Sequence, residues 1–262
     1  GLDAFVAYTY GDAEAVNEGT SSQNSSQWRG QIHINGRNFP VLGRSDFSLG
    51  HRVIAALNYK LDWSDNVRTN FSLFFNGQSG TAFSYVVGDR SGQNLTNESG
   101  STSRNRSLPF VPASSSDIVL VEDGGLSPAQ QWTLLDAYIS DDNALNDARG
   151  GYAEKNGSRA PFNGTFDFAI RQDFAVNAGG TKHKLQLSFD VFNFANLLNK
   201  NWGAIYFVPG DFNNYEFLQF QGFDGNTPTY SFTDDRLGKE KFDIADFSSR
   251  WRARLGIRYI FN

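Results

Sequence analysis

The stretch W-R-A-R-L-G-I-R-Y-I-F-N, residues 251–262, decides how the rest of the chain is interpreted, because its side chains alternate between two kinds. One face carries an apolar set, made up of Trp251, Ala253, Leu255, Ile257, Tyr259 and Phe261. The other face carries Arg250, Arg252, Arg254 and Arg258. A period of two residues predicts a β-strand with one apolar face and one polar face.

Five earlier stretches repeat this pattern, namely residues 2–12, 52–63, 68–76, 165–176 and 184–191. Strands of globular proteins usually have about 5–6 residues, whereas a tilted strand that crosses a bilayer needs about 9–11. The six stretches are of the longer kind. We therefore expect an all-β protein whose six long antiparallel strands form a segment of a transmembrane β-barrel.

The connections between these stretches alternate in length. Short turns lie at 64–67 and 177–182, and long polar segments lie at 13–47, 77–164 and 196–247. Short turns on one side and long loops on the other are typical of outer-membrane barrels, in which the turns are periplasmic. Within the extracellular loops, residues 127–130 (S-P-A-Q) predict the start of a short helix that ends near Ile139. Residues 215–223 and 227–232 predict a small hairpin.

The composition excludes several classes of protein. The 262 residues include no Cys, are 15% aromatic, carry a formal net charge of −5 and have a mean hydropathy of −0.44. No apolar run is long enough for a transmembrane helix. The absence of Cys excludes disulfides, Cys-ligated metals and a cysteine nucleophile. The lack of a basic excess argues against a nucleic-acid partner.

No motif in the sequence indicates catalysis, a cofactor or a metal. The three His, at 33, 51 and 183, are scattered, and no nucleotide-binding loop or nucleophile elbow occurs. The oxygen-rich cluster Asp141, Asp142, Asn143 and Asp147 does not have the spacing of a calcium-binding loop. We interpret it as a solvated loop, and we expect no enzymatic activity.

Two sets of strand residues are the candidate functional side chains. Aromatic residues near strand ends on the apolar faces are predicted to lie at the lipid–water interfaces: Tyr8, Tyr10, Tyr59, Trp63, Trp251, Tyr259 and Phe261. Basic residues on the polar faces are predicted to face the lumen: Arg52, Lys60, Arg68, Arg171, Arg250, Arg252, Arg254 and Arg258. They form either an electropositive wall or ordinary cross-strand pairs with Asp62, Asp167, Asp173 and Asp190. We favour the pairs, because these acids occur on the same faces.

Residues 251–262 resemble the C-terminal strand of an outer-membrane protein, whose terminal aromatic residue is read by the barrel-insertion machinery. Four further segments resemble the C-terminal barrel region of TonB-dependent outer-membrane receptors, in particular the Oar-like branch. They are S-L-G-H-R-V-I-A-A-L-N-Y (48–59), G-Q-S-G-T-A-F-S-Y (77–85), G-G-Y-A-E-K-N-G-S-R-A-P-F (150–162) and F-D-V-F-N-F-A-N-L-L-N-K-N-W-G (189–203).

This resemblance implies uptake of a scarce nutrient through the outer membrane of a Gram-negative bacterium. Such receptors have an N-terminal plug and a barrel of about 22 strands, and the inner-membrane motor acts on the plug through TonB. Residues 1–262 would then be a fragment that corresponds to the last six strands. The partners implied are the plug, the other strands, TonB and the insertion machinery, with a surface lipoprotein as a further candidate. The three long loops are predicted to contact the substrate.

Two other functions are consistent with the same residues. If residues 203–233 supplied two more strands, the chain would close a small passive barrel or adhesin of about eight strands. We disfavour this reading because that region lacks two clean alternations of ten residues. A secreted, all-β carbohydrate-binding module is the second alternative, with Trp28, Trp132 and Trp202 available to stack on sugars.

Overall fold

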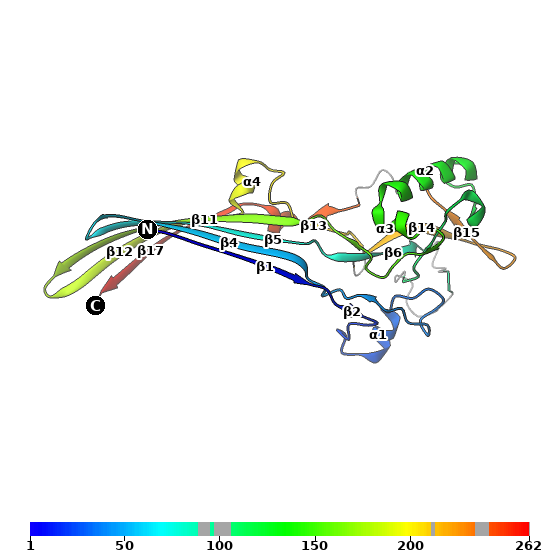
Figure 1. Ribbon diagram of the computed structural model, residues 1–262, viewed down its shortest axis with the longest axis horizontal. Coiled ribbons are helices and arrows are strands. Elements are labelled where there is room, and N and C mark those ends of the chain that lie inside the picture. Colours follow the sequence, from blue (N-terminus) through cyan, green and yellow to red (C-terminus); the bar gives the residue numbers. More distant parts are fainter. Residues whose placement is uncertain (89–94, 97–105, 211–212, 234–240, 262) are drawn as a thin grey trace.

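The computed structural model describes residues 1–88, 95–96, 106–210, 213–233 and 241–261. The fold is mostly antiparallel β-structure. It is elongated, with a long sheet at one end and a more compact region at the other (Figure 1). No helix in the described ranges is long and apolar enough to pass through a membrane.

The long sheet, here called the wall sheet, contains the six strands that the alternation predicted. They follow in the order β1 (Leu2–Gly11), β4 (Gly50–Ser64), β5 (Val67–Gln78), β11 (Asn163–Ala178), β12 (Thr181–Phe192) and β17 (Arg252–Phe261). Each strand pairs antiparallel with the next. Gly179 and Gly180 connect β11 to β12 with φ of 59° and 79°, a conformation that glycine adopts readily.

The wall sheet has one continuous apolar face and one continuous polar face. Residues that lie opposite each other on neighbouring strands share a face, and the register aligns like with like. One apolar row is Leu2, Tyr59, Phe71, Ile170, Phe189 and Leu255. The neighbouring row on the other face is Asp3, Asn58, Ser72, Ala169, Asp190 and Arg254. Large apolar side chains remain exposed on the first face, and Leu255 and Ile257 are 82% and 79% exposed.

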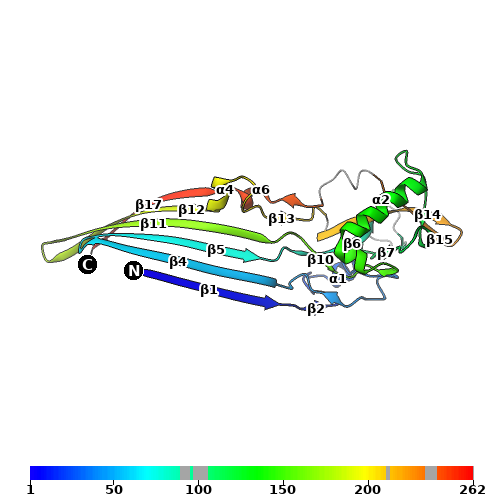
Figure 2. The same ribbon diagram turned by 45° about the horizontal axis from the view of Figure 1, so that its top comes forward.

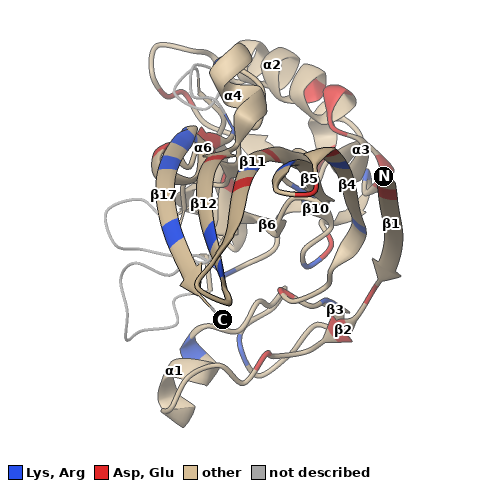
Figure 3. Cartoon of the chain, turned by 90° about the vertical axis from the view of Figure 1, so that its left-hand side faces the viewer, with Lys and Arg blue, Asp and Glu red and all other residues tan. Residues whose placement is uncertain are grey.

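Seen end-on, the six strands follow an open arc (Figure 3). Strands β1 and β17 stand at opposite ends of the sheet, and among the described residues each is hydrogen-bonded to a strand on one side only. The sheet therefore does not close on itself. Its two outer strands expose unpaired backbone N–H and C=O groups along their free edges.

The second part of the molecule, here called the loop head, comes from the long connections. Its mixed sheet has the order β10 (Ser158–Arg159), β6 (Ala82–Gly88), β14 (Asn214–Asp224), β15 (Thr227–Ser231) and β8 (Val119–Leu120). Strands β6 and β14 pair in parallel, although they belong to different connections. The helices α2 (Pro128–Asp141) and α3 (Asn143–Asp147) accompany this sheet (Figure 2).

The main buried core lies in the loop head. It includes Phe83, Leu135, Ile139, Leu145, Phe217 and Phe232, all at most 1% exposed. The sequence predicted polar loops with a short helix and a hairpin, and both of these elements are confirmed. Helix α2 begins with a capping box between Ser127 and Gln130, and the hairpin is β14–β15. Because this hairpin belongs to the loop head, it adds no strands to the wall sheet.

Shorter elements complete the described parts of the chain. They are β2 (Glu14–Ala15), α1 (Asn24–Arg29), β3 (Gly43–Arg44), β7 (Phe110–Val111), the 3₁₀ turn Ser115–Asp117, β9 (Gly151–Tyr152), α4 (Phe194–Leu198), β13 (Tyr206–Phe207), β16 (Asp243–Ile244) and α6 (Asp246–Ser249).

Candidate functional site

The basic residues of the wall sheet mostly take part in cross-strand contacts. Asp190 accepts from Arg254 at 2.9 Å and from Arg171 at 3.4 Å. Asp62 pairs with Arg68 on the opposing strand and with Lys60 at 3.3 Å. Arg52 donates to Asn76 Oδ1 at 3.3 Å. The pairing that the sequence favoured therefore occurs at Asp62 and Asp190.

Other predicted pairs differ in their partners. Asp173 binds Lys184 at 2.8 Å, a lysine that the sequence did not single out. Asp167 accepts from the backbone N–H of Asn193 at 2.8 Å instead of from an arginine. Among the described residues, Arg258 forms no ion pair and lies opposite Gln186.

Two of the predicted lumen-facing arginines lie at or before the start of the last strand. Arg250 precedes β17, is 74% exposed and lies 3.7 Å from Asp246 on α6. Its assignment to the strand was wrong, because α6 extends to Ser249 and the ladder begins only at Arg252. Arg252 packs over the ring of Phe247 at 5.0 Å.

The seven predicted interface aromatics are all exposed and lie toward the two ends of the wall sheet. Tyr8, Tyr10 and Trp251 lie at the loop end. Tyr59, Trp63, Tyr259 and Phe261 lie toward the turn end, where Tyr59 is opposite Leu2, the first residue of β1.

Two of the histidines contact these aromatics, which sequence spacing could not reveal. His51 Nδ1 lies 2.8 Å from the Tyr8 hydroxyl, and His183 Nδ1 lies 2.6 Å from the Tyr259 hydroxyl. In both pairs the partners are diagonal neighbours on adjacent strands, 43 and 76 residues apart in sequence. In each pair the histidine provides a hydrogen-bond partner for the tyrosine hydroxyl, while the tyrosine ring stays on the apolar face.

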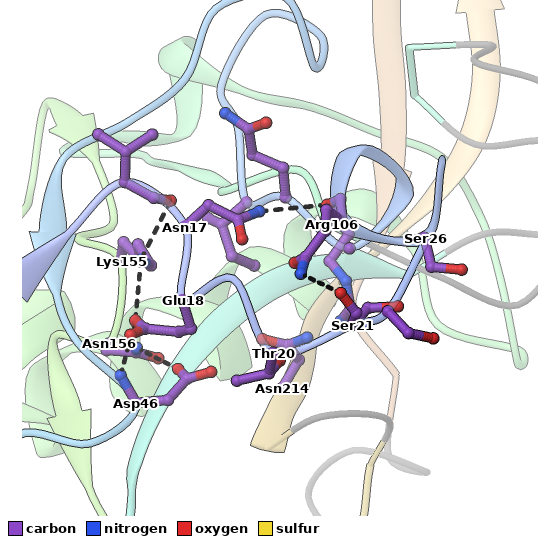
Figure 4. A pocket seen from close by; sticks show the side chains of 16 residues that line it. Asn17, Glu18, Thr20, Ser21, Ser26, Asp46, Arg106, Lys155, Asn156 and Asn214 are labelled. Carbon is purple, nitrogen blue, oxygen red and sulfur yellow. Dashed lines mark hydrogen bonds and ion pairs between the residues drawn. The ribbon is translucent and has the colours of Figure 1, made fainter. Parts of the chain in front are cut away.

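A cavity of about 460 Å³ lies between the first long loop and the loop head (Figure 4). Its lining is mostly polar and comes from α1, the preceding turn and the segments that face them. It consists of Val16, Asn17, Glu18, Thr20, Ser21, Ser22, Ser26, Gln27, Gly30, Gln31, Ile32, Asp46, Arg106, Lys155, Asn156 and Asn214. Ligand pockets commonly have volumes of about 300–1,000 Å³. Amide and hydroxyl groups predominate, so the cavity suits a small hydrophilic ligand.

The segment 154–159 fixes one side of this cavity. The Lys155 ammonium donates to the carbonyl oxygens of Ala15 and Val16 at 2.6 and 3.3 Å and lies 3.6 Å from Glu18. Asn156, whose φ is 52°, donates to Asp46 Oδ1 at 2.6 Å. These contacts bind the first long loop to the loop head. Lys155 was not among the predicted site residues, although its segment carried part of the family resemblance.

A buried polar cluster stabilises the loop head beside its aromatic core. The Tyr85 hydroxyl donates to Asp142 Oδ2 at 2.5 Å, and the Lys241 ammonium contacts both groups at 2.7 and 2.8 Å. Burial raises the pKa of Tyr85 and that of Tyr138 far above the ordinary value. Burial alone would raise the pKa of Asp142, but the bonds from Lys241 and Tyr85 hold it below its usual range.

This cluster corrects one sequence expectation. Asp142 is not solvated, since its side chain is only 15% exposed, and its other oxygen caps α3 by accepting from the Leu145 N–H at 3.1 Å. Within the described ranges, no three His, Asp or Glu side chains gather as a metal site would require.

In comparisons with known proteins, no family model, no curated protein and no solved structure matches the chain.

Proposed function

We propose that this chain is the C-terminal wall and loop head of a TonB-dependent outer-membrane receptor that takes up a scarce, hydrophilic nutrient. The observation that carries this proposal is the apolar face of the wall sheet. It extends over six strands, no other part of the described chain covers most of it, and Leu255 and Ile257 are largely exposed. Bilayer hydrocarbon is the environment that such a face fits.

The stagger of the strands supports a barrel wall. Following the residue pairings from strand to strand gives every residue of the wall sheet a level on the numbering of β5. On this scale β1 extends from level 71 to level 80, and β17 extends from level 65 to level 74. Both ends of the sheet are thus displaced by six residues over five strand-to-strand steps. At about 3.3 Å per residue and about 4.8 Å between strands, the displacement corresponds to a tilt of about 40°, within the ~35–45° range of barrel strands.

The height of the sheet supports the same proposal. Strands β1 and β17 each have ten residues, a length of about 33 Å. At a tilt of about 40° they span about 25 Å, the height of the apolar band of outer-membrane barrels. Along this slanted band, Tyr8, Tyr10 and Trp251 lie at the loop-side boundary. The other four aromatics lie at the turn-side boundary, so both predicted girdles fit.

The open edges and the cavity support the receptor function. A sheet in hydrocarbon must have its edges paired, so β1 and β17 would each bind a further strand of the receptor. Basic and acidic groups on the polar face would line the lumen around the plug. The cavity beside Asn17 and Lys155 would receive the nutrient at the cell surface, before TonB-driven movement of the plug releases it.

Membrane fractionation of the native protein tests this proposal. We expect the protein to stay in the outer-membrane pellet after washing with carbonate, to dissolve only in detergent and to change its gel mobility on heating. Loss of the protein should abolish import of one nutrient, and a protonophore should have the same effect. A monomer that stays soluble without detergent would overturn the proposal.

A further inference from the structure

We propose that residues 194–203 and 246–251, here called the outer shelf, bind the surface of the surrounding bilayer and lie in its interfacial zone. This inference rests on the proposed membrane position of the wall sheet. It goes further by assigning a lipid-binding role to a segment outside the strands.

Helix α4 of the outer shelf lies on the apolar side of the wall sheet. The ring of Phe194, the first residue of α4, packs against Phe168 of β11 with a centroid separation of 5.6 Å. Phe168 lies in the apolar row with Leu73 and Val191. Helix α4 is accordingly seen on the convex side of the arc of strands (Figures 1 and 3). Helix α4 lies next to the loop-side ends of β12 and β17. This position places it at the loop-side boundary of the apolar band.

The outer shelf presents apolar side chains outward. Leu198 is 64% exposed, Phe247 75%, Trp202 54% and Leu197 44%. These residues come from two chain segments about 45 residues apart, and Trp251 continues the surface onto the wall sheet. Exposed leucine and aromatic rings that adjoin a lipid-facing surface are typical of interfacial anchors.

The outer shelf is a defined structure and not a loose loop. Asn193, which is 4% exposed, donates to the carbonyl oxygens of Gly203 and Ser249 at 2.9 and 2.7 Å. The Trp251 N–H donates to Asn196 Oδ1 at 3.3 Å. Gly203 has a φ of 64°, and a Cβ there would collide with the Asn193 amide. The two segments are therefore held together, while Leu198, Trp202 and Phe247 remain largely exposed.

The charge of the outer shelf does not favour a charged macromolecule over a lipid surface as its partner. The outer shelf contains two basic residues, Lys200 and Arg250, and one acidic residue, Asp246, which lies 3.7 Å from Arg250. Neither a polyanion nor a basic peptide would find a dominant charge here. Apolar area beside scattered basic groups suits the depth at which lipid headgroups meet acyl chains.

The test uses the absence of Cys to place one fluorescent label at a time. Leu198→Cys, Phe247→Cys, Leu255→Cys and Glu122→Cys are made in the whole native protein, labelled with nitrobenzoxadiazole and reconstituted into phosphatidylcholine vesicles. Leu255 reports on the wall sheet, and Glu122 lies in the loop head. We expect blue-shifted emission at Leu198 and Phe247, with quenching by a nitroxide placed high on the lipid acyl chain. Glu122 should be quenched by aqueous iodide only.

The outcomes separate the two proposals. If Leu255 is in lipid while Leu198 and Phe247 are quenched by iodide, the outer shelf does not bind lipid and the wall sheet still does. If the labels at Leu198 and Phe247 are shielded from both quenchers, a protein covers the outer shelf and this inference is wrong. If Leu255 itself is in water, the membrane wall and the outer shelf proposal fail together.

Discussion

At the residue scale, Asp142 links the stability of the loop head to pH. Its pKa in the folded protein lies below the ordinary value, although burial opposes this, because Lys241 and Tyr85 bind the ionised form. The stabilisation is therefore present above the ordinary carboxyl pKa of about 3.9 and is lost as the pH falls through the lower folded pKa. We expect the melting temperature of the loop head, followed by near-ultraviolet circular dichroism, to fall below about pH 4.

Asp142→Asn is the matched variant for this prediction. It keeps the size of the side chain but removes the ionisable group, so it should weaken the loop head at pH 7 by about 1–3 kcal/mol and flatten the acid limb of the profile. An acid limb as steep as in the unmodified protein would assign the effect to other carboxylates.

Also at the residue scale, Thr20 lines the cavity and is exposed. Thr20→Trp should fill part of the cavity of about 460 Å³ and reduce nutrient import by about tenfold or more, because about 1.4 kcal/mol of lost binding has that effect. Glu122→Trp places the same Trp side chain at an exposed position away from the cavity and serves as the control. Equal import by the two variants, measured at equal abundance, would remove the cavity from the uptake route.

At the scale of elements, the introduction of arginine should destabilise the wall sheet on its apolar face and change its stability little on its polar face. Leu255 lies near the middle of the slanted band and is 82% exposed on the apolar face. Leu255→Arg should cost about 2–4 kcal/mol in lipid. Asn58→Arg, on the polar face beside Asp3, should change the stability by less than about 0.5 kcal/mol. Urea unfolding in vesicles measures both, and equal costs would contradict the assignment of the faces.

A second prediction for elements concerns Asn193, which stands between β12 and α4 with a φ of 52°. Asn193→Ala removes two hydrogen bonds, one buried and one partly buried, and places a residue less suited to this conformation, so we expect a local loss of about 2–3 kcal/mol. Asn193→Gly tolerates the conformation and should lose less. Hydrogen exchange should rise at 194–203 and 246–251 and not in β11 or β5. A uniform rise over the chain would argue against a local role.

The sequence predicts those elements whose signal is local. The alternation from Arg252 to Phe261 predicts a strand, and Ser127 with Gln130 predicts the start of a helix, since both patterns lie within one element. Strand β6 has no such period because it is buried on both faces, although its unbroken run A-F-S-Y-V-V could have indicated an internal strand.

Contacts between residues far apart in the chain could not be predicted from the sequence. The pairing of β6 with β14 and the meeting of Lys241 with Asp142 join residues from different connections, and nothing in a single sequence specifies them. The cavity was missed for the same reason, because its walls lie far apart along the chain.

At the scale of the whole molecule, the wall sheet and the loop head are stabilised differently. The wall sheet exposes its apolar face, whereas the loop head encloses Phe217 with the rings of Tyr85, Tyr138 and Phe232. Phe217→Ala should destabilise the loop head by about 3–5 kcal/mol. Hydrogen exchange in vesicles should show faster exchange in β14 and β6 and unchanged exchange in β4 and β5. One common shift across both parts would show that they unfold as one unit.

The parallel contact between β6 and β14 also dictates an order of events during biogenesis. Strand β6 leaves the ribosome well before β14, and the two are separated by the hairpin of β11 and β12. Until that hairpin and the following connection have been made, β6 pairs only with β10 in its sheet, and its other edge stays open for β14. Throughout this interval the newly made chain is exposed to aggregation along the unpaired edge of β6.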